Sequence, residues 1–242
     1  MINKEKIPKT CFILGGGYSV VEGIKLGLLD KLKDYFVIGT NETYKYFNST
    51  FLASVDGSFI ENNAKQLKNL PLVITRETPQ SLKSPLKNLI ICPYSTDTYN
   101  RNLSKGVYSN KLVGLFALSL AIYLIDTGVV YLLGFDFGNI TEKKDKLGRI
   151  YTHWYQDKDL HYNGIGMVSY YKIKNREKLF DVYKNENKVK IYLVGKTNLK
   201  TFTNISYQEM FNQIENLPKV NQEEIRTSTK KILNNLHFRF TF

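Results

Sequence analysis

The chain has 242 residues, of which 43% are hydrophobic, and this is enough for one domain with a complete core. Its net charge of +12 favours an anionic partner, although the lysines are spread along the chain and do not cluster. Two cysteines exclude a disulfide framework, and the longest apolar stretch, residues 112–125, is too short to cross a bilayer. With no signal peptide visible, we expect a cytoplasmic protein without a transmembrane segment.

The first predicted strand, residues 10–14, ends in three consecutive glycines. Glycine lets the backbone turn sharply and lie close to a ligand. Ser19 and Glu22 then have the spacing of a capping box, which indicates a helix start. Free amides and the helix dipole attract negative charge at such a corner, so it is expected to bind a nucleotide or another phosphorylated molecule. The alternative is a glycine-rich turn without a ligand. The candidate residues of this corner are Gly15, Gly16, Gly17 and Ser19.

The glycine spacing is not that of the dinucleotide fingerprint. Val20 stands where the third glycine would be, and no acidic residue lies about twenty positions further on at a strand end. The phosphate-binding pattern that ends in Gly-Lys-Ser/Thr is also missing, which excludes a P-loop kinase.

Short apolar runs alternate with helical patterns along the chain, which predicts a Rossmann-like α/β fold with a parallel sheet sandwiched by helices. The expected strands are 10–14, 35–38, 51–55, 72–74, 89–92, 129–133 and 189–194, and the expected helices are 20–32, 62–68, 110–126 and 167–185.

Residues 142–163 are polar, aromatic and without periodicity, and a long loop after a strand in such a fold is typical of a lid. We therefore expect a nucleotide-binding catalytic domain over 1–205 that includes this lid. Residues 206–242, with helices at 207–215 and 222–236 and a short alternating run at the end, form a helical appendage. It would pack on the core or on a second subunit, which would make a homo-oligomer.

Ligands bind outside the carboxyl ends of the strands in open α/β sheets, so the residues that follow the strands are candidates. Asn41 can contact a base, ribose or phosphate. Asp56 and Asp136 can hold a metal, a ribose or an acceptor hydroxyl, the alternative for each being a turn cap. Ser109, next to Asn110, precedes an apolar helix and is expected to cap it, although it could instead face a nucleotide.

Two of the three histidines, His153 and His161, lie in the expected lid and are candidate acids or bases. Trp154 is the one tryptophan and could stack on a base or a sugar ring of an acceptor. No Cys/His cluster has zinc spacing, and no Gly-x-Ser-x-Gly nucleophile elbow is present.

Five segments occur in an order that resembles a known superfamily: Leu14-Gly-Gly-Gly-Tyr-Ser19, Ile38-Gly-Thr-Asn41, Ser54-Val-Asp56, Gly106-Val-Tyr-Ser109 and Tyr131-Leu-Leu-Gly-Phe-Asp136. Over residues 10–205 the chain resembles bacterial lipo-oligosaccharide sialyltransferases and 6-hydroxymethylpterin diphosphokinase-like proteins. It is most similar to the uncharacterised phage and prophage members of that superfamily.

The resemblance implies that the glycine turn and Asn41 hold the nucleotide of a donor and that Tyr162 contacts a phosphate. Ile165 stands where the sialyltransferases have their catalytic base, so a base would have to be His153, His161 or Asp136. Tyr18 also replaces the proline that is usual in the phage-type glycine motif.

Together these features lead us to expect a glycosyltransferase that uses a nucleotide-sugar donor. Its acceptor would be a hydroxyl of a modified base in phage DNA, with Trp154 stacking on the extruded base, or of a surface glycan. One alternative is a diphosphokinase-like enzyme that uses ATP and magnesium, with Asp56 and Asp136 as metal ligands. Another is a nucleotide- or nucleic-acid-binding protein without catalysis.

Overall fold

A computed structural model describes residues 4–96, 99–138, 140–144, 148, 150–157, 176–236 and 238–240. They form an α/β fold in which one large, mostly parallel sheet is flanked by helices, so the expected Rossmann-like architecture is confirmed. None of the helices in this part of the chain combines the length and apolar character that a membrane span needs.

Nine strands form the main sheet in the order β10-β9-β8-β1-β2-β3-β4-β5-β11, and only β11 pairs antiparallel. From β1 the chain adds strands in one direction as far as β5 and then returns to place β8 on the other side of β1. The reversal of strand order therefore lies between β1 and β8. The strands are β1 (Thr10–Leu14), β2 (Val37–Thr40), β3 (Phe51–Ser54), β4 (Val73–Arg76), β5 (Leu89–Cys92), β8 (Gly128–Leu133), β9 (Val189–Val194), β10 (Thr203–Ile205) and β11 (Arg239–Phe240).

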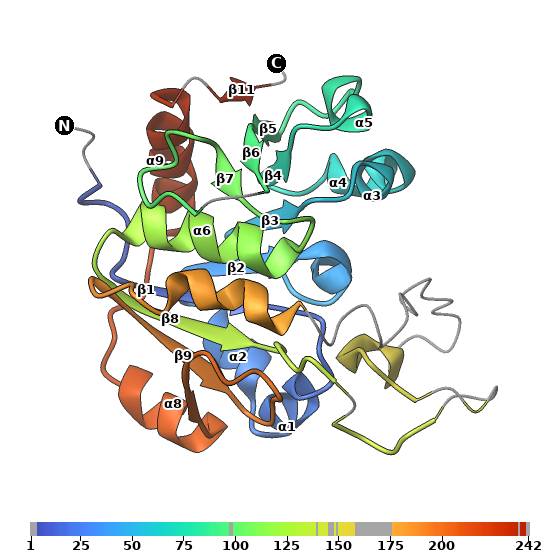
Figure 1. The fold of residues 1–242 in the computed structure, drawn as a ribbon, viewed down its shortest axis with the longest axis vertical. Coiled ribbons are helices and arrows are strands. Elements are labelled where there is room, and N and C mark those ends of the chain that lie inside the picture. The colour runs from blue at the N-terminus through green and yellow to red at the C-terminus, as the bar shows by residue number, and fades with distance from the viewer. Residues whose placement is uncertain are drawn as a thin grey trace.

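Both faces of the sheet are buried, which explains why its central strands are apolar almost throughout. Helix α6 (Val113–Ile125) and the 3-10 helix η3 (Glu177–Tyr183) lie on one face, and α1 and α2 lie on the other (Figure 1). The remaining helices are α1 (Val20–Lys25), α2 (Leu28–Leu32), η1 (Asn41–Lys45), α3 (Gly57–Asn62), α4 (Ala64–Leu67), α5 (Pro79–Leu82), η2 (Trp154–Asp157), α8 (Tyr207–Ile214) and α9 (Gln222–Asn234).

The predicted helices are shorter in the structure, for local reasons. The predicted helix 20–32 is divided into α1 and α2 by Gly27, whose φ is +83°. Predicted helix 110–126 begins only at Val113, because Asn110 and Lys111 have φ of +39° and +63° and cannot continue a right-handed helix. Of the predicted helix 167–185, the described residues contain η3.

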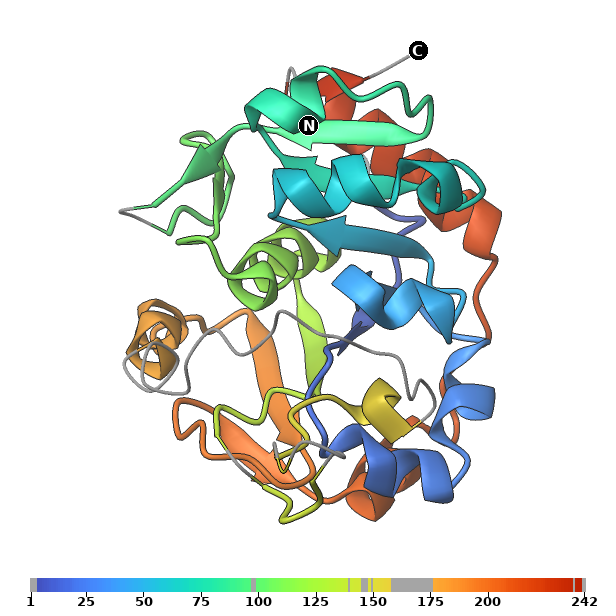
Figure 2. The ribbon, with the colours of Figure 1, turned by 90° about the vertical axis from the view of Figure 1, so that its right-hand side faces the viewer.

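A small second sheet precedes α6. Strands β6 (Tyr94–Ser95) and β7 (Val107–Tyr108) pair in parallel, and they project beside the main sheet near the start of α6 (Figure 2).

The C-terminal segment packs on the core. Tyr207 and Met210 of α8 have no exposed surface, and Leu233 of α9 is equally buried. β11 then adds to the edge of the sheet beside β5. The last helices therefore complete the hydrophobic core, one of the two arrangements expected from the sequence.

Candidate functional site

The turns after β1 and β8 meet at the point where the strand order reverses, which is where open α/β sheets bind ligands. The amide of Gly15 donates to the carbonyl of Leu133 (2.7 Å), and that of Gly17 donates to the carbonyl of Gly134 (3.0 Å). A Cβ at Gly15 would lie 2.8 Å from the Gly134 carbonyl oxygen, and one at Gly17 would lie 2.5 Å from Asp136. These glycines are therefore required by the close approach of two turns, whether or not a ligand binds there.

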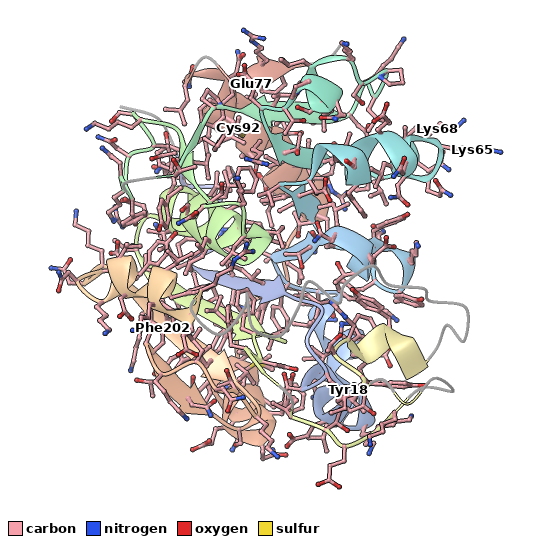
Figure 3. The ribbon with its side chains drawn as sticks, turned by 45° about the vertical axis from the view of Figure 1, so that its right-hand side comes forward. Tyr18, Lys65, Lys68, Glu77, Cys92 and Phe202 are labelled. Carbon is pink, nitrogen blue, oxygen red and sulfur yellow. The ribbon has the colours of Figure 1, made fainter. Side chains whose placement is uncertain are left out.

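Asp136 lies against the start of α1 and is the central polar residue of this region. Its Oδ2 accepts from the Ser19 amide (3.0 Å), and its Oδ1 accepts a short hydrogen bond from the Ser19 hydroxyl. A further backbone hydrogen bond comes from Tyr18. Figure 3 shows Tyr18 beside the start of α1, below the segment that carries η2.

The expected capping box of Ser19 and Glu22 is wrong. Ser19 has helical dihedral angles and its side chain caps no amide of α1. Its hydroxyl is instead used by Asp136, a residue that comes 117 positions later and so could not be paired with it from local spacing. The Tyr18 and Ser19 amides therefore already bind a carboxylate of the protein, and the Gly15 and Gly17 amides bind backbone carbonyls.

Burial controls the charge of Asp136, which is 7% exposed. Loss of hydration raises the pKa of its carboxyl group to about 6, and the hydrogen bonds from Ser19 and Tyr18 act in the opposite direction. A carboxyl group with this pKa changes its protonation state close to neutral pH, as an acid or base catalyst must.

Residues 150–157 of the expected lid pack on the glycine turn. His153 forms an antiparallel bridge with Gly17, and the Trp154 amide donates to the Gly16 carbonyl (3.0 Å). The described part of the lid therefore forms one wall of the region around Asp136.

Trp154 is a core residue in this structure. It is 1% exposed, its Nε1 donates to the Gly15 carbonyl (3.0 Å), and its ring packs edge-on against Tyr46 and Tyr155. Stacking on an acceptor would need an exposed ring, so the position of Trp154 does not agree with the role expected for it.

His153 is partly buried and stacks on Tyr155, with ring centroids 5.1 Å apart. Burial lowers the pKa of its imidazole to about 4, so the ring is neutral at pH 7. A Cβ at Gly16 would lie 2.7 Å from the His153 ring and 3.1 Å from the Tyr155 hydroxyl. Gly16 thus makes room for these two side chains.

Asn41 and Asp56 lie further along the same edge of the sheet. Asn41 has φ of +45°, and its Oδ1 accepts from the buried hydroxyl of Ser54 (3.1 Å). Asp56 accepts from the Ser58 amide (2.9 Å) and caps α3, which is the alternative considered for it. Because β1 and β2 lie between β8 and β3, the ends of these two strands are separated by three strand spacings, about 14 Å, so Asp56 and Asp136 do not face one ion. The described residues contain no group of three Asp, Glu, His or Cys that could hold a metal.

Ser109 does not cap α6 as expected. The N-cap residue is Leu112, and no side chain caps the helix. The Ser109 side chain is fully buried, and its hydroxyl has no hydrogen-bond partner among the described residues. The start of α6 lies beside the turn that follows β8: a Cβ at Gly114 would be only 2.7 Å from the Phe135 ring. The uncapped start of α6 therefore lies beside the turn that follows β8, and the unused Ser109 hydroxyl belongs to the segment that leads into this helix.

His161, Tyr162 and Ile165 lie outside the described residues. Tyr207 reaches the region from α8 and is not among the residues predicted from the sequence. Two glycines that border it, Gly23 within a helix and Gly195 after a strand, were the available signal for a large side chain packed closely there.

Comparisons with protein-family models, with curated proteins and with solved structures gave no match.

Proposed function

We propose that the protein is a glycosyltransferase that uses a nucleotide-sugar donor and that Asp136 is its general base. The observation that carries this proposal is a buried carboxyl group, with its pKa raised to about 6, at the point where the strand order reverses. The neutral imidazole of His153 stands on the wall of the same region, where it would orient the reacting groups.

The donor phosphate binds at the start of α6 in this proposal, because the start of α1 is taken by Asp136. The helix dipole and the first amides of α6, which no side chain caps, favour a negative charge. The Ser109 hydroxyl, buried and unused within the described chain, supplies a donor at the same place. Asn41 contacts the base or ribose of the donor through its side-chain amide group, which donates no hydrogen bond to a described residue.

The reaction transfers the sugar to an acceptor hydroxyl. The acceptor oxygen forms a bond to the anomeric carbon while the bond from that carbon to the donor phosphate breaks. The proton of the hydroxyl moves to Asp136, and the electron pair leaves with the phosphate, which the start of α6 stabilises. The net charge of +12 suits an anionic acceptor such as DNA, and a surface glycan is the other class.

A second candidate is a nucleotide-binding protein without catalysis. It is favoured by the hydrogen bonds between Asp136 and Ser19, which would also be made by a carboxylate that only closes the start of α1. The two candidates differ in whether a bond is broken in the bound donor.

A panel of CMP-, UDP- and GDP-sugars, ATP and duplex DNA, screened by thermal shift, identifies the ligand. Release of free nucleotide from the stabilising sugar nucleotide then tests catalysis. Ser109→Ala loses no hydrogen bond of the fold and should weaken donor binding, while Ser104→Ala in an exposed loop should not. Binding without turnover would favour the second candidate, and stabilisation by none of the nucleotides would contradict both.

A further inference from the structure

Tyr207, the first residue of α8, is held in a narrow space between two other elements. A Cβ at Gly23 of α1 would lie 2.4 Å from its ring, and a Cβ at Gly195, after β9, would lie 2.8 Å from it. Any side chain at either position would displace the ring. Glycine at both positions leaves room for the ring. Helix α8 can therefore pack against α1 and the end of β9.

The hydroxyl group of Tyr207 lies near Ser19 and Asp136. It is fully buried and has no hydrogen-bond partner among the described residues, so a hydrogen bond with Ser19 requires one of the two hydroxyl groups to shift toward the other. Burial raises the pKa of Tyr207, the negative charges of Asp136 and Glu22 raise it further, and the Ser19 side chain lowers it. A buried hydroxyl without a partner costs free energy, so its position next to the Ser19–Asp136 pair needs a reason.

We propose that Tyr207 is a positioning residue that supports the Ser19–Asp136 pair in both of its protonation states. The reason is the chemistry of hydroxyl groups, each of which can donate and accept. With Asp136 ionised, Tyr207 donates to Ser19 and Ser19 donates to Asp136. With Asp136 protonated, the carboxyl group donates to Ser19 and Ser19 donates to Tyr207. The base role of Asp136 rests on the proposed function, whereas the coupling to Tyr207 does not.

The other titratable side chains next to this group are Glu22 on α1 and His153 on the wall formed by residues 150–157. Neither belongs to α8, so both side chains are retained when Tyr207 is changed. A phenol is a better donor than acceptor, so removal of its hydroxyl should disfavour the ionised form of Asp136 more than the protonated form.

The test is a pH titration of the Asp136 side-chain carboxyl carbon by NMR in the wild type, Tyr207→Phe and Tyr131→Phe. Tyr131 is the matched control, because it is also a buried tyrosine that reaches α8, where its hydroxyl donates to Gln213 (2.8 Å). We expect the Asp136 pKa to rise by about one unit in Tyr207→Phe, a tenfold change in proton affinity, and to stay unchanged in Tyr131→Phe. An unchanged pKa in Tyr207→Phe, or equal shifts in both variants, would overturn the proposal.

Ser19→Ala provides the second test, because it removes the intermediate hydroxyl. In that background Tyr207→Phe should cause no further shift of the Asp136 pKa, and a full shift would exclude coupling through Ser19. These titrations need no donor or acceptor. Loss of coupling would therefore leave the transferase proposal standing, and absence of transfer with the coupling intact would contradict only the transferase.

Discussion

The Asp136 carboxylate accepts from both the amide and the hydroxyl of Ser19, so one residue after β8 closes the start of the helix that follows β1. This pairing joins the two turns on either side of the reversal in strand order. As a result, the site expected to bind an anion is occupied by a buried carboxyl group of the protein.

Asp136→Asn should lower sugar transfer by a factor on the order of a hundred or more, because the amide keeps the shape but cannot take a proton. The acid limb of the pH–rate profile should lie near pH 6, the pKa of Asp136 in the folded protein. His153→Ala should leave that limb in place, because burial holds the pKa of His153 near 4. An acid limb that moves only in the His153 variant would assign the base to the imidazole.

The stability of the protein should also depend on Asp136 in a defined pH window. The pKa is about 6 in the folded state against an ordinary value of 3.8, so the folded state holds this proton more tightly. The contribution of this group to stability is complete below about pH 4 and is lost as the pH rises through about 6.

Asp136→Asn removes this dependence. Relative to the wild type, the variant should therefore gain roughly 2 to 3 kcal/mol in the free energy of unfolding between pH 4 and pH 7, measured by urea denaturation. A constant difference across that window would show that the carboxyl group has an ordinary pKa.

Gly16→Val should weaken donor binding without abolishing it and without unfolding the sheet, because it displaces the segment 150–157 but leaves the proposed phosphate site at the start of α6 in place. Even its Cβ would come within 2.7 Å of the His153 ring, so the segment 150–157 must move away from the glycine turn. Titration calorimetry with the donor nucleotide measures the affinity, and circular dichroism checks the fold. Gly16→Ala combined with His153→Ala should displace this segment less, because the nearest contact is then removed and the Tyr155 hydroxyl at 3.1 Å remains. Undiminished affinity in a folded Gly16→Val variant would separate this turn from the binding site.

Trp154 should report on the site by fluorescence, since it is the only tryptophan and donates to the Gly15 carbonyl. Because the ring is buried, its emission should be blue-shifted and poorly quenched by acrylamide, and the right donor nucleotide should change it. Trp154→Phe should lower the free energy of unfolding by about 1 to 3 kcal/mol, because the buried carbonyl loses its partner. Strong quenching in the free protein would contradict the buried position.

Patterns that are local in the chain were enough to predict the architecture. The apolar runs at β1, β5, β8 and β9 predicted a parallel sheet, because a strand covered on both faces must be apolar along its whole length. The residues after β1 and β8 were also found as candidates, because the carboxyl ends of parallel strands share one edge.

Tertiary structure decided which groups those residues face. Ser19 and Glu22 have capping-box spacing, yet the Ser19 hydroxyl is taken by Asp136, since a buried carboxyl group gains more from that bond than an amide at the helix start. Trp154 lies in a segment whose composition predicted a lid, but its ring is buried and donates to the Gly15 carbonyl. Periodicity and spacing describe a segment's own geometry, whereas these hydrogen bonds join positions more than a hundred residues apart. Which residues form these hydrogen bonds is decided by the order of the strands in the folded sheet.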